Sequence, residues 1–223
     1  MKLAKILVLE GIDGSGKSTQ IELIKKYFNE KHIKNEHIHF PIYNDNEASN
    51  IIAQYLRGEL GDLKTVNPFF VANIFAMDRF LYLPKLYKKL LTNDIIILDR
   101  YVFSSMAYQG AKFDDNKLSS TIKKWIYDFE FNFLKLPYPD LTIFFDVPIE
   151  EISKRLSENR NTTNREYLNG KDDIHEKDIE YQKCVRENYL SITSKNYNII
   201  KTGNSNPEEI FNKYKDIIDN IIY

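Results

Sequence analysis

The fold of this 223-residue chain is decided by Gly11-Ile12-Asp13-Gly14-Ser15-Gly16-Lys17-Ser18. The stretch matches the pattern Gly-x-x-x-x-Gly-Lys-Ser, in which glycines let the backbone curl until successive N–H groups face phosphate oxygens. A continuous apolar run over 6–9 precedes it, and an amphipathic pattern over 17–31 follows it. A buried strand, a glycine-rich turn and a helix in this order predict a site for a nucleoside triphosphate, ATP or GTP, at the helix N-terminus.

The loop residues have different expected parts in binding that nucleotide. Lys17 is expected to reach the β and γ phosphates, and the hydroxyl of Ser18 is expected to bind Mg²⁺. The alternative interpretation is a glycine-rich turn whose lysine is incidental. The buried strand before the loop and the amphipathic helix after it favour the phosphate-binding interpretation. The remaining loop residues expected to contact the nucleotide are Gly11, Gly14, Ser15, Gly16 and Thr19.

Other apolar runs of strand length extend this pattern along the chain. They lie at 38–40, 95–98, 141–145 and 197–200, and helical patterns separate them. Continuous rather than alternating runs are typical of parallel strands covered on both faces. The sequence therefore predicts an α/β P-loop NTPase fold with a five-stranded parallel sheet flanked by helices.

One segment of the chain does not fit that core. Residues 156–176 contain Arg160 and Arg165, several Asn and Thr, and almost no apolar side chain. Such a segment cannot bury itself, so we expect a basic lid over the site. The last helix is expected to begin at 206–209, Asn-Pro-Glu-Glu, with a capping residue, proline and early carboxylates. The length predicts a single domain over 1–223.

Composition and charge exclude several classes of protein. The chain has thirty-one Lys and Arg and thirty-two Asp and Glu, so its net charge is −1. It therefore has no net positive charge that would attract nucleic acid or anionic lipid. No apolar stretch approaches the roughly 20 residues that a bilayer requires. The single Cys184 and four scattered His residues indicate no disulfide framework or zinc site. We expect a cytoplasmic enzyme with no nucleic-acid or membrane partner.

The run at 95–98 ends in Asp99. Because the carboxyl ends of parallel strands line the ligand crevice, Asp99 is expected beside the phosphate loop, where it binds Mg²⁺ or positions an attacking oxygen. An acid that caps the following helix is the alternative interpretation.

A phosphate loop does not by itself distinguish a kinase, a switch GTPase and an ATP-driven machine. The guanine-reading pattern Asn/Thr-Lys-x-Asp is absent, since the nearest run, at 212–216, has the wrong spacing. A kinase for a phosphorylated small molecule needs fixed cations around the acceptor phosphate. Arg79 and Arg100 are suitable, although an isolated arginine is more often a surface or ion-paired residue.

The motifs together resemble the thymidylate kinase family over most of the chain. The resemblance rests on the phosphate loop through Thr19 and on five further blocks: Phe40-Pro41, Phe75-Ala76-Met77-Asp78-Arg79, Asp99-Arg100-Tyr101-Val102-Phe103-Ser104-Ser105, Ala107-Tyr108-Gln109-Gly110 and Phe145-Asp146-Val147-Pro148. The block that begins at Asp99 is far more specific than the phosphate loop, which many NTPases share.

This resemblance implies a homodimer that uses ATP and Mg²⁺ to phosphorylate dTMP. The resemblance implies that Asp13 binds the 3′-hydroxyl of the acceptor nucleotide, that Arg100 binds its phosphate and that Tyr108 lies at its 2′ position. It also implies that Phe75 stacks on the thymine and that Arg79, Ser105 and Gln109 contact the base edge. Phe40, Pro41 and Tyr43 are expected beside them. Without the resemblance, Phe75 would be interpreted as core packing, because Phe69, Phe70 and Phe80 are close to it in sequence.

Two departures from the family pattern keep alternatives open. Tyr43 stands where the family often has an arginine at the acceptor phosphate, so another deoxynucleoside monophosphate or a free deoxynucleoside is an alternative acceptor. Gly14 stands where some members have a phosphate-loop arginine, so Arg160 and Arg165 are the expected clamp and Arg155 is expected to stack on adenine. A non-catalytic nucleotide-binding or switch module is the alternative from another class.

Overall fold

The computed structural model describes most of the chain, namely residues 3–43, 45–63, 65–152, 174–175, 178–203 and 205–222. Nearly all of the predicted lid lies outside these residues. The three arginines expected there, Arg155, Arg160 and Arg165, therefore also lie outside the described residues.

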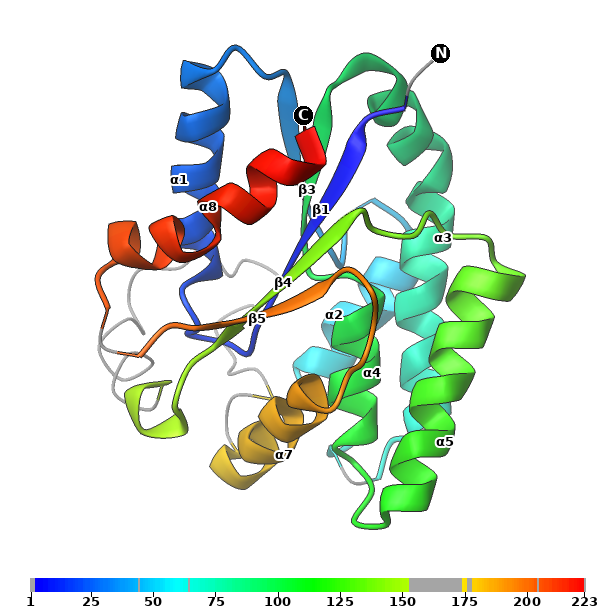
Figure 1. Cartoon of the computed structure of the whole chain (residues 1–223). Helices are drawn as coiled ribbons and strands as arrows, with labels where there is room; N and C mark the ends of the chain where they lie inside the picture. The colour runs from blue at the N-terminus through cyan, green and yellow to red at the C-terminus, as the bar shows by residue number, and fades with distance from the viewer. Residues whose placement is uncertain are drawn as a thin grey trace.

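The centre of the molecule is a five-stranded sheet in which every pairing is parallel, in the order β2-β3-β1-β4-β5 (Figure 1). This confirms the predicted α/β fold. The strands are β1 (Lys5–Glu10), β2 (Asn35–His39), β3 (Ile95–Asp99), β4 (Leu141–Asp146) and β5 (Tyr197–Lys201). β1 lies in the middle, so the phosphate loop that follows it opens at the centre of the sheet's carboxyl edge.

The prediction at 38–40 located only the end of β2. The strand begins at Asn35 and ends at His39, and Phe40 follows it. β2 is an edge strand with only Ile38 fully buried, so its first residues are polar and give no apolar signal. The helix predicted over 17–31 ends at Glu30.

Helices cover both faces of the sheet. α1 (Lys17–Glu30) and α8 (Pro207–Ile222) cover one face. The other face is covered by α3 (Pro68–Thr92), α4 (Val102–Gly110), α5 (Asn116–Tyr127) and α7 (Ile179–Leu190), with α2 (Glu47–Leu56) packed on α3 and the short π-helical segment η1 (Asp128–Phe133) after α5. Among the described residues, no helix is both long enough and apolar enough to cross a bilayer.

β1 shows why its strand is apolar on both faces. Leu7 and Leu9 pack into the cluster formed with α1 and α8, whereas Ile6 and Val8 pack into the cluster formed with α3, α4 and α5. Leu7, Val8 and Leu9 are completely buried. Because successive side chains of a strand point to opposite faces, a strand between two helical layers needs apolar residues at every position.

Candidate active site

The phosphate loop has the backbone that its glycines predict. Gly14 and Gly16 have φ values of 76° and 89°, in the left-handed region that favours glycine. A Cβ on Gly11 would collide with the Ser15 hydroxyl. The curled loop therefore depends on glycine for its turn and for its close internal packing.

The N-terminus of α1 is left open, unlike other helix starts in the molecule. Five helices begin with a side chain that accepts a backbone N–H group: Asn46, Asn67, Asp115, Asp178 and Asn206. α1 begins at Gly16 with no such cap, and the buried Ser15 hydroxyl has no hydrogen-bond partner among the described residues. Unsatisfied donors at the positive end of a helix are suited to phosphate oxygens.

Lys17 lies beside this open end. Its ammonium donates to the carbonyl oxygens of Gly11, at 3.0 Å, and Ile12, at 3.4 Å, and its side chain is buried. Burial and, secondarily, the charge of Arg100 lower the pKa of Lys17, while the carboxylates of Asp99 and Asp13 oppose them. An additional anion at this position would stabilise the ammonium, as a phosphate group would.

An ion pair joins the phosphate loop to the residue that follows β3. Arg100 Nη2 donates to Asp13 Oδ1 at 2.5 Å, and the Tyr108 hydroxyl donates to Asp13 Oδ2 at 3.1 Å. Burial alone would raise the pKa of Asp13, but the charges of Arg100 and Lys17 outweigh it and lower the pKa to about 2. Asp13 is therefore ionised and held in place between the two cations.

Asp99 ends β3 in register with Leu9 of β1, which brings its carboxylate beside the loop. Oδ2 lies 3.1 Å from His39 Nδ1, while Oδ1 is buried with no hydrogen-bond partner among the described residues. Burial would raise the pKa of Asp99, but the hydrogen bond from His39 and the charge of Lys17 hold the pKa below its usual value. A partly unsatisfied, ionised carboxylate beside a phosphate loop suits Mg²⁺.

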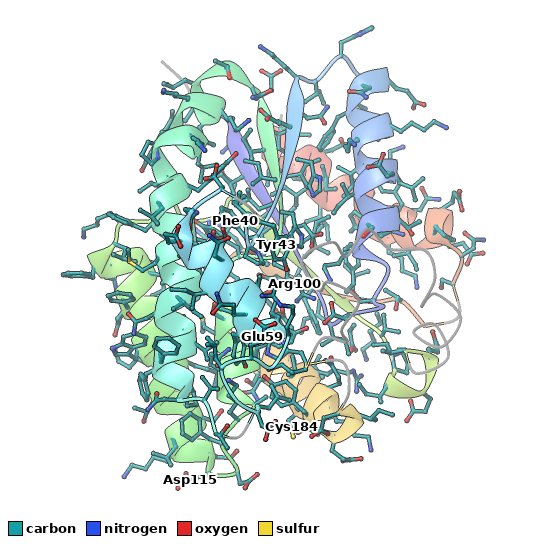
Figure 2. The ribbon with its side chains drawn as sticks, turned by 180° about the vertical axis from the view of Figure 1, so that it is seen from behind. Phe40, Tyr43, Glu59, Arg100, Asp115 and Cys184 are labelled. Carbon is teal, nitrogen blue, oxygen red and sulfur yellow. The ribbon has the colours of Figure 1, made fainter. Side chains whose placement is uncertain are left out.

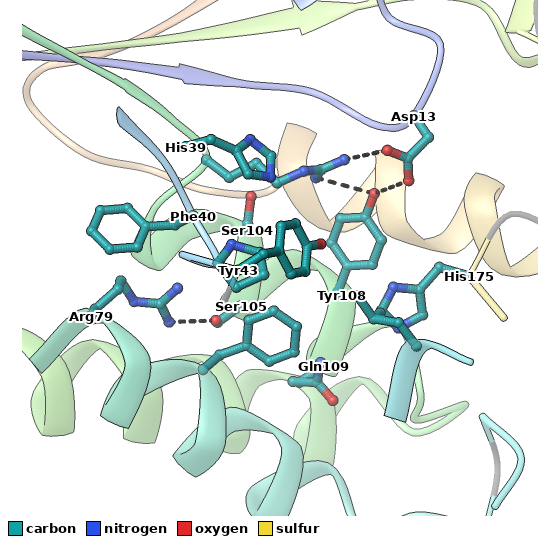
Figure 3. A pocket seen from close by; sticks show the side chains of 14 residues that line it. Asp13, His39, Phe40, Tyr43, Arg79, Ser104, Ser105, Tyr108, Gln109 and His175 are labelled. Atoms are coloured by element: carbon teal, nitrogen blue, oxygen red, sulfur yellow. Dashed lines mark hydrogen bonds and ion pairs between the residues drawn. The ribbon is translucent and has the colours of Figure 1, made fainter. Parts of the chain in front are cut away.

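Asp13 and Arg100 both line a pocket with about 610 Å³ of empty space, open solvent included (Figure 3). Ten of its lining residues are the predicted acceptor-binding residues: Asp13, Phe40, Pro41, Tyr43, Phe75, Arg79, Arg100, Ser105, Tyr108 and Gln109. In the view from behind, Phe40, Tyr43 and Arg100 lie close together, and Cys184 lies well away from them (Figure 2). The structure brings the predicted residues together, and their individual roles stay predictions.

The two arginines proposed from the sequence are both ion-paired and both line the pocket. Arg79 donates from Nε and Nη2 to the carboxylate of Glu130, at 2.6 and 2.7 Å, and Nη2 also donates to Ser105 Oγ at 2.7 Å. Gln109 Oε1 is buried without a hydrogen-bond partner in the described part of the chain. The pocket thus combines aromatic walls with directed polar groups.

The aromatic side chains of α3 divide between the pocket and other surroundings. Phe75 lines the pocket, whereas Phe69 packs edge-on against Trp125 with ring centroids 5.2 Å apart. Phe70 and Phe80 are exposed. Phe75 is therefore the aromatic residue of this run that is placed to stack on a ligand.

Glu10, the last residue of β1, orients α4 beneath the pocket. Its completely buried carboxylate accepts the backbone N–H groups of Tyr101 and Ser104, at 3.0 and 3.2 Å, and the Tyr189 hydroxyl at 3.0 Å. Glu10 therefore caps α4 from a different element, which holds Ser105 and the rest of the helix against the pocket. Burial raises the pKa of Glu10.

Sequence reasoning missed four lining residues: His39, Leu56, Ser104 and His175. His175 lies beside Tyr108, and its Nε2 is 3.0 Å from the Tyr55 hydroxyl, to which Lys112 donates at 2.7 Å. Burial and then the charge of Lys112 lower the pKa of His175 to about 3, so its imidazole is neutral. His39 could have been noticed because it precedes Phe40-Pro41, whereas no local pattern indicates His175.

The parallel sheet and the open phosphate loop define a P-loop NTPase fold, and a pocket adjoins the loop. The family model described as thymidylate kinase matches residues 9–213. This chain is 31% identical over 218 residues to a "Probable thymidylate kinase" of Methanococcus aeolicus, covering 98% of this chain and 96% of that relative. It is 30% identical over 192 residues to a thymidylate kinase of Mycobacterium tuberculosis, covering 86% and 87%.

A solved thymidylate kinase structure from Candida albicans has the same fold, with a TM-score of 0.76 and 24% identity over 98% of this chain and 92% of that one. The family match and the sequence relatives agree over most of this chain. The chain belongs to the thymidylate kinase family.

Proposed function

We propose that this protein transfers the γ phosphoryl group of ATP to the 5′ phosphate of dTMP, giving dTDP and ADP. The observation that carries the proposal is that the phosphate loop and the pocket share Asp13, which pairs with the pocket residue Arg100. Family membership supports both the reaction and the acceptor. ATP is the donor used by the family.

The proposed mechanism needs no covalent intermediate on the enzyme. An oxygen of the acceptor phosphate bonds to the γ phosphorus while the bond to the oxygen bridging the β and γ phosphorus atoms breaks, and that bridging oxygen leaves with ADP. Because the attacking oxygen is already anionic, catalysis requires alignment and charge neutralisation rather than a strong base. Lys17 neutralises the donor phosphates and Arg100 the acceptor phosphate, and Asp13 orients Arg100. Arg160 and Arg165 are proposed to complete the clamp.

Mg²⁺ binding is proposed at the Ser18 hydroxyl and Asp99. The unpartnered Asp99 Oδ1 and the exposed Ser18 fit an ion that takes few protein ligands and completes its shell with phosphate oxygens and water. Consistent with this, the described residues contain no cluster of three or more His, Cys, Asp or Glu that could hold a metal by itself. The ion would neutralise phosphate charge and orient the γ phosphoryl group.

The pocket accounts for the choice of acceptor. Phe75 is proposed to stack on the thymine, with Arg79, Ser105 and Gln109 at the base edge. Tyr108 is proposed to occupy the space that a 2′-hydroxyl would need. Since a missing hydrogen bond would leave a buried polar group unpaired, such a site discriminates strongly between bases.

A homodimer is proposed from the family and from an exposed apolar surface. That surface lies mainly on α3 and includes Phe70, Met77, Phe80 and Leu81. Contiguous apolar side chains on a surface helix are typical of a protein interface. Light scattering after size exclusion tests this proposal, which a monomer at micromolar concentration would contradict.

We further propose one kinase domain over residues 1–223, with a lid near 156–176, acting in the cytoplasm without nucleic acid.

ADP release from MgATP tests the function, with dTMP, other nucleoside monophosphates and free nucleosides compared as acceptors. Strong stimulation by dTMP is expected. Stimulation by nucleosides alone would instead indicate a deoxynucleoside kinase, and equal stimulation by several deoxynucleoside monophosphates would indicate a broader enzyme. ATP binding without stimulation by any acceptor would indicate a non-catalytic module. The presence of Tyr43, which supplies no charge at the acceptor phosphate, makes the comparison between monophosphates informative.

A further inference from the structure

Glu130 is a completely buried acid on η1 that no motif in the sequence indicates. It lies behind Arg79, away from the pocket surface, so it does not line the site. Its carboxylate accepts two N–H groups of Arg79, and the two side chains are 1% and 2% exposed. The question is what a buried charge at this position does.

The π-helical form of η1 determines which residues reach the interior. After Ile126, an uninterrupted α-helix would direct positions 129, 130 and 133 towards the core. Glu130 is buried as that spacing expects, but Phe131 is buried in place of position 133, and Phe133 is 73% exposed. Single π-helical turns are often found at functional sites. On this turn the buried acid meets the guanidinium group of Arg79.

The bidentate pair leaves one nitrogen of Arg79 for a ligand. Nε and Nη2 donate to Glu130, and Nη2 also donates to Ser105 Oγ. Within the described part of the chain, Nη1 makes no hydrogen bond, and Arg79 lines the pocket. The fork geometry of a guanidinium means that fixing two of its nitrogens also fixes the direction of the third.

The neighbouring acid, Asp78, is engaged with other partners. Asp78 is adjacent in sequence, but its carboxylate accepts the backbone N–H of Ile42, at 3.0 Å, and the side-chain amide of Asn46, at 3.2 Å. Burial tends to lower the pKa of Arg79, but the charge of Glu130 outweighs it and raises that pKa. Glu130 therefore compensates the charge of the buried guanidinium group.

Stability alone gives a weak reason for such a pair. Removing two charges from water costs several kcal/mol per ion, and apolar residues of similar volume often stabilise a core at least as well. An ion pair at this position therefore suggests that the direction of the arginine matters. A fixed donor rejects a ligand that presents another donor, because two N–H groups cannot hydrogen-bond to each other.

We propose that Glu130 is a specificity-determining positioning residue, which holds Arg79 so that Nη1 presents an N–H donor to the base of the acceptor nucleotide. The inference deepens the proposed function and rests on it. A pyrimidine with a carbonyl oxygen at C4 accepts this hydrogen bond. A pyrimidine with an amino group at C4 presents a donor and is rejected. Thymine is of the first kind and cytosine of the second.

The test is equilibrium binding of dTMP and dCMP, measured by calorimetry without ATP so that it does not depend on turnover. In E130Q, an NH₂ group replaces one carboxylate oxygen. This NH₂ group faces the N–H groups of Arg79 and disturbs the pair of hydrogen bonds that Arg79 donates to residue 130. We expect the preference for dTMP over dCMP to fall about 10-fold or more, mainly through weaker dTMP binding, while ATP binding stays within about 2-fold. In steady-state assays, the KM for dTMP rises more than kcat falls.

Two further variants separate positioning from folding. E130D keeps the charge but withdraws the carboxylate by one methylene, so it is expected to fold like the wild type and still lose most of the preference. Asp128 lies on the same turn and contacts only the exposed side chains of Lys124 and Asn132 among the described residues. The D128N variant is therefore the control and should leave nucleotide binding and the thermal midpoint unchanged. Thermal unfolding of all variants reports on their folding.

The outcomes distinguish this inference from the proposed function. An unchanged dTMP-to-dCMP ratio in folded E130D or E130Q overturns the role of Glu130, even if the thermal midpoint falls. A wild-type chain that binds dCMP as well as dTMP also overturns it. If the wild type binds dTMP selectively but never phosphorylates it, the proposed function fails and the role of Glu130 is still tested by binding.

Discussion

Replacement of Lys112 by methionine is expected to make the protein more stable near neutral pH. Lys112 follows α4, and its ammonium donates to the buried Tyr55 hydroxyl at 2.7 Å. Burial lowers the pKa of Lys112 from its usual 10.5 to about 7. The folded protein therefore releases this proton about 3.5 pH units before the unfolded chain does.

The magnitude follows from proton linkage. Between about pH 7 and pH 10 the unfolded chain binds more protons at this lysine than the folded protein, so this group's contribution to stability rises with pH. One pKa unit corresponds to about 1.4 kcal/mol, and the full difference to roughly 5 kcal/mol. Because the side chain keeps some contact with solvent, we expect the charge on Lys112 to destabilise the folded protein by about 3 kcal/mol at neutral pH.

The hydrogen bond to Tyr55 acts in the opposite direction. Its loss in K112M costs about 1 kcal/mol, which leaves the variant more stable than the wild type by about 2 kcal/mol near pH 7. This advantage is expected to vanish or reverse by about pH 10, where Lys112 is neutral in the folded protein and increasingly so in the unfolded chain.

Urea unfolding of wild type and K112M across this pH range measures the difference. K117M, which replaces an exposed lysine in the first turn of α5, is the matched control and should show almost no difference from the wild type at any pH. A difference between K112M and wild type that stays constant from about pH 7 to pH 10 would refute the reasoning, because it would mean that the folded protein keeps the Lys112 proton as readily as the unfolded chain.

Three other predictions concern the phosphate loop and its surroundings. K17M should lose at least about 100-fold in ADP release with dTMP while its thermal midpoint stays near that of the wild type, because Lys17 neutralises charge in the transition state; near-normal turnover would contradict the loop assignment. E10Q should lose about 2 kcal/mol of stability in urea, since a carboxylate that accepts the N–H groups of Tyr101 and Ser104 becomes an amide; an unchanged midpoint would mean that α4 does not depend on this cap. Asp13 has a folded pKa of about 2 against a usual 3.8, so its ionic contribution of roughly 2 kcal/mol is present above about pH 4 and is lost as the pH falls towards 2; D13N should therefore be less stable than wild type at neutral pH and approach it in acid, and equal pH profiles would contradict this.

The phosphate loop could be predicted from sequence because its parts are contiguous. The strand β1, the loop and the start of α1 follow one another along the chain, and each is formed by local rules: apolar residues for a buried strand, glycines for positive φ, and helical periodicity after Lys17. The apolar runs likewise predicted a parallel sheet, since strands covered on both faces need apolar residues throughout. Only the half-exposed edge strand β2 was poorly located.

The motif blocks also predicted residues that line the pocket, but through resemblance rather than through local physical rules. Nine residues from five separate blocks, together with Tyr43, line one pocket, and nothing in their local patterns would have brought them together. Phe75 illustrates this. Its neighbours on α3 are equally aromatic, and only the packing of Phe69 against Trp125 and the exposure of Phe80 separate a ligand-facing ring from the others.

The amino-acid sequence alone was enough to predict the strand, the phosphate loop and the helix after it, because these features depend on neighbouring residues. The ion pairs at the pocket could be found only in the folded chain. Arg100 meets Asp13 across 87 residues because β3 lies beside β1, and Arg79 meets Glu130 across 51 residues. Charged partners carry no periodicity that marks them as partners, so their pairing depends on the register and packing of elements far apart in the chain.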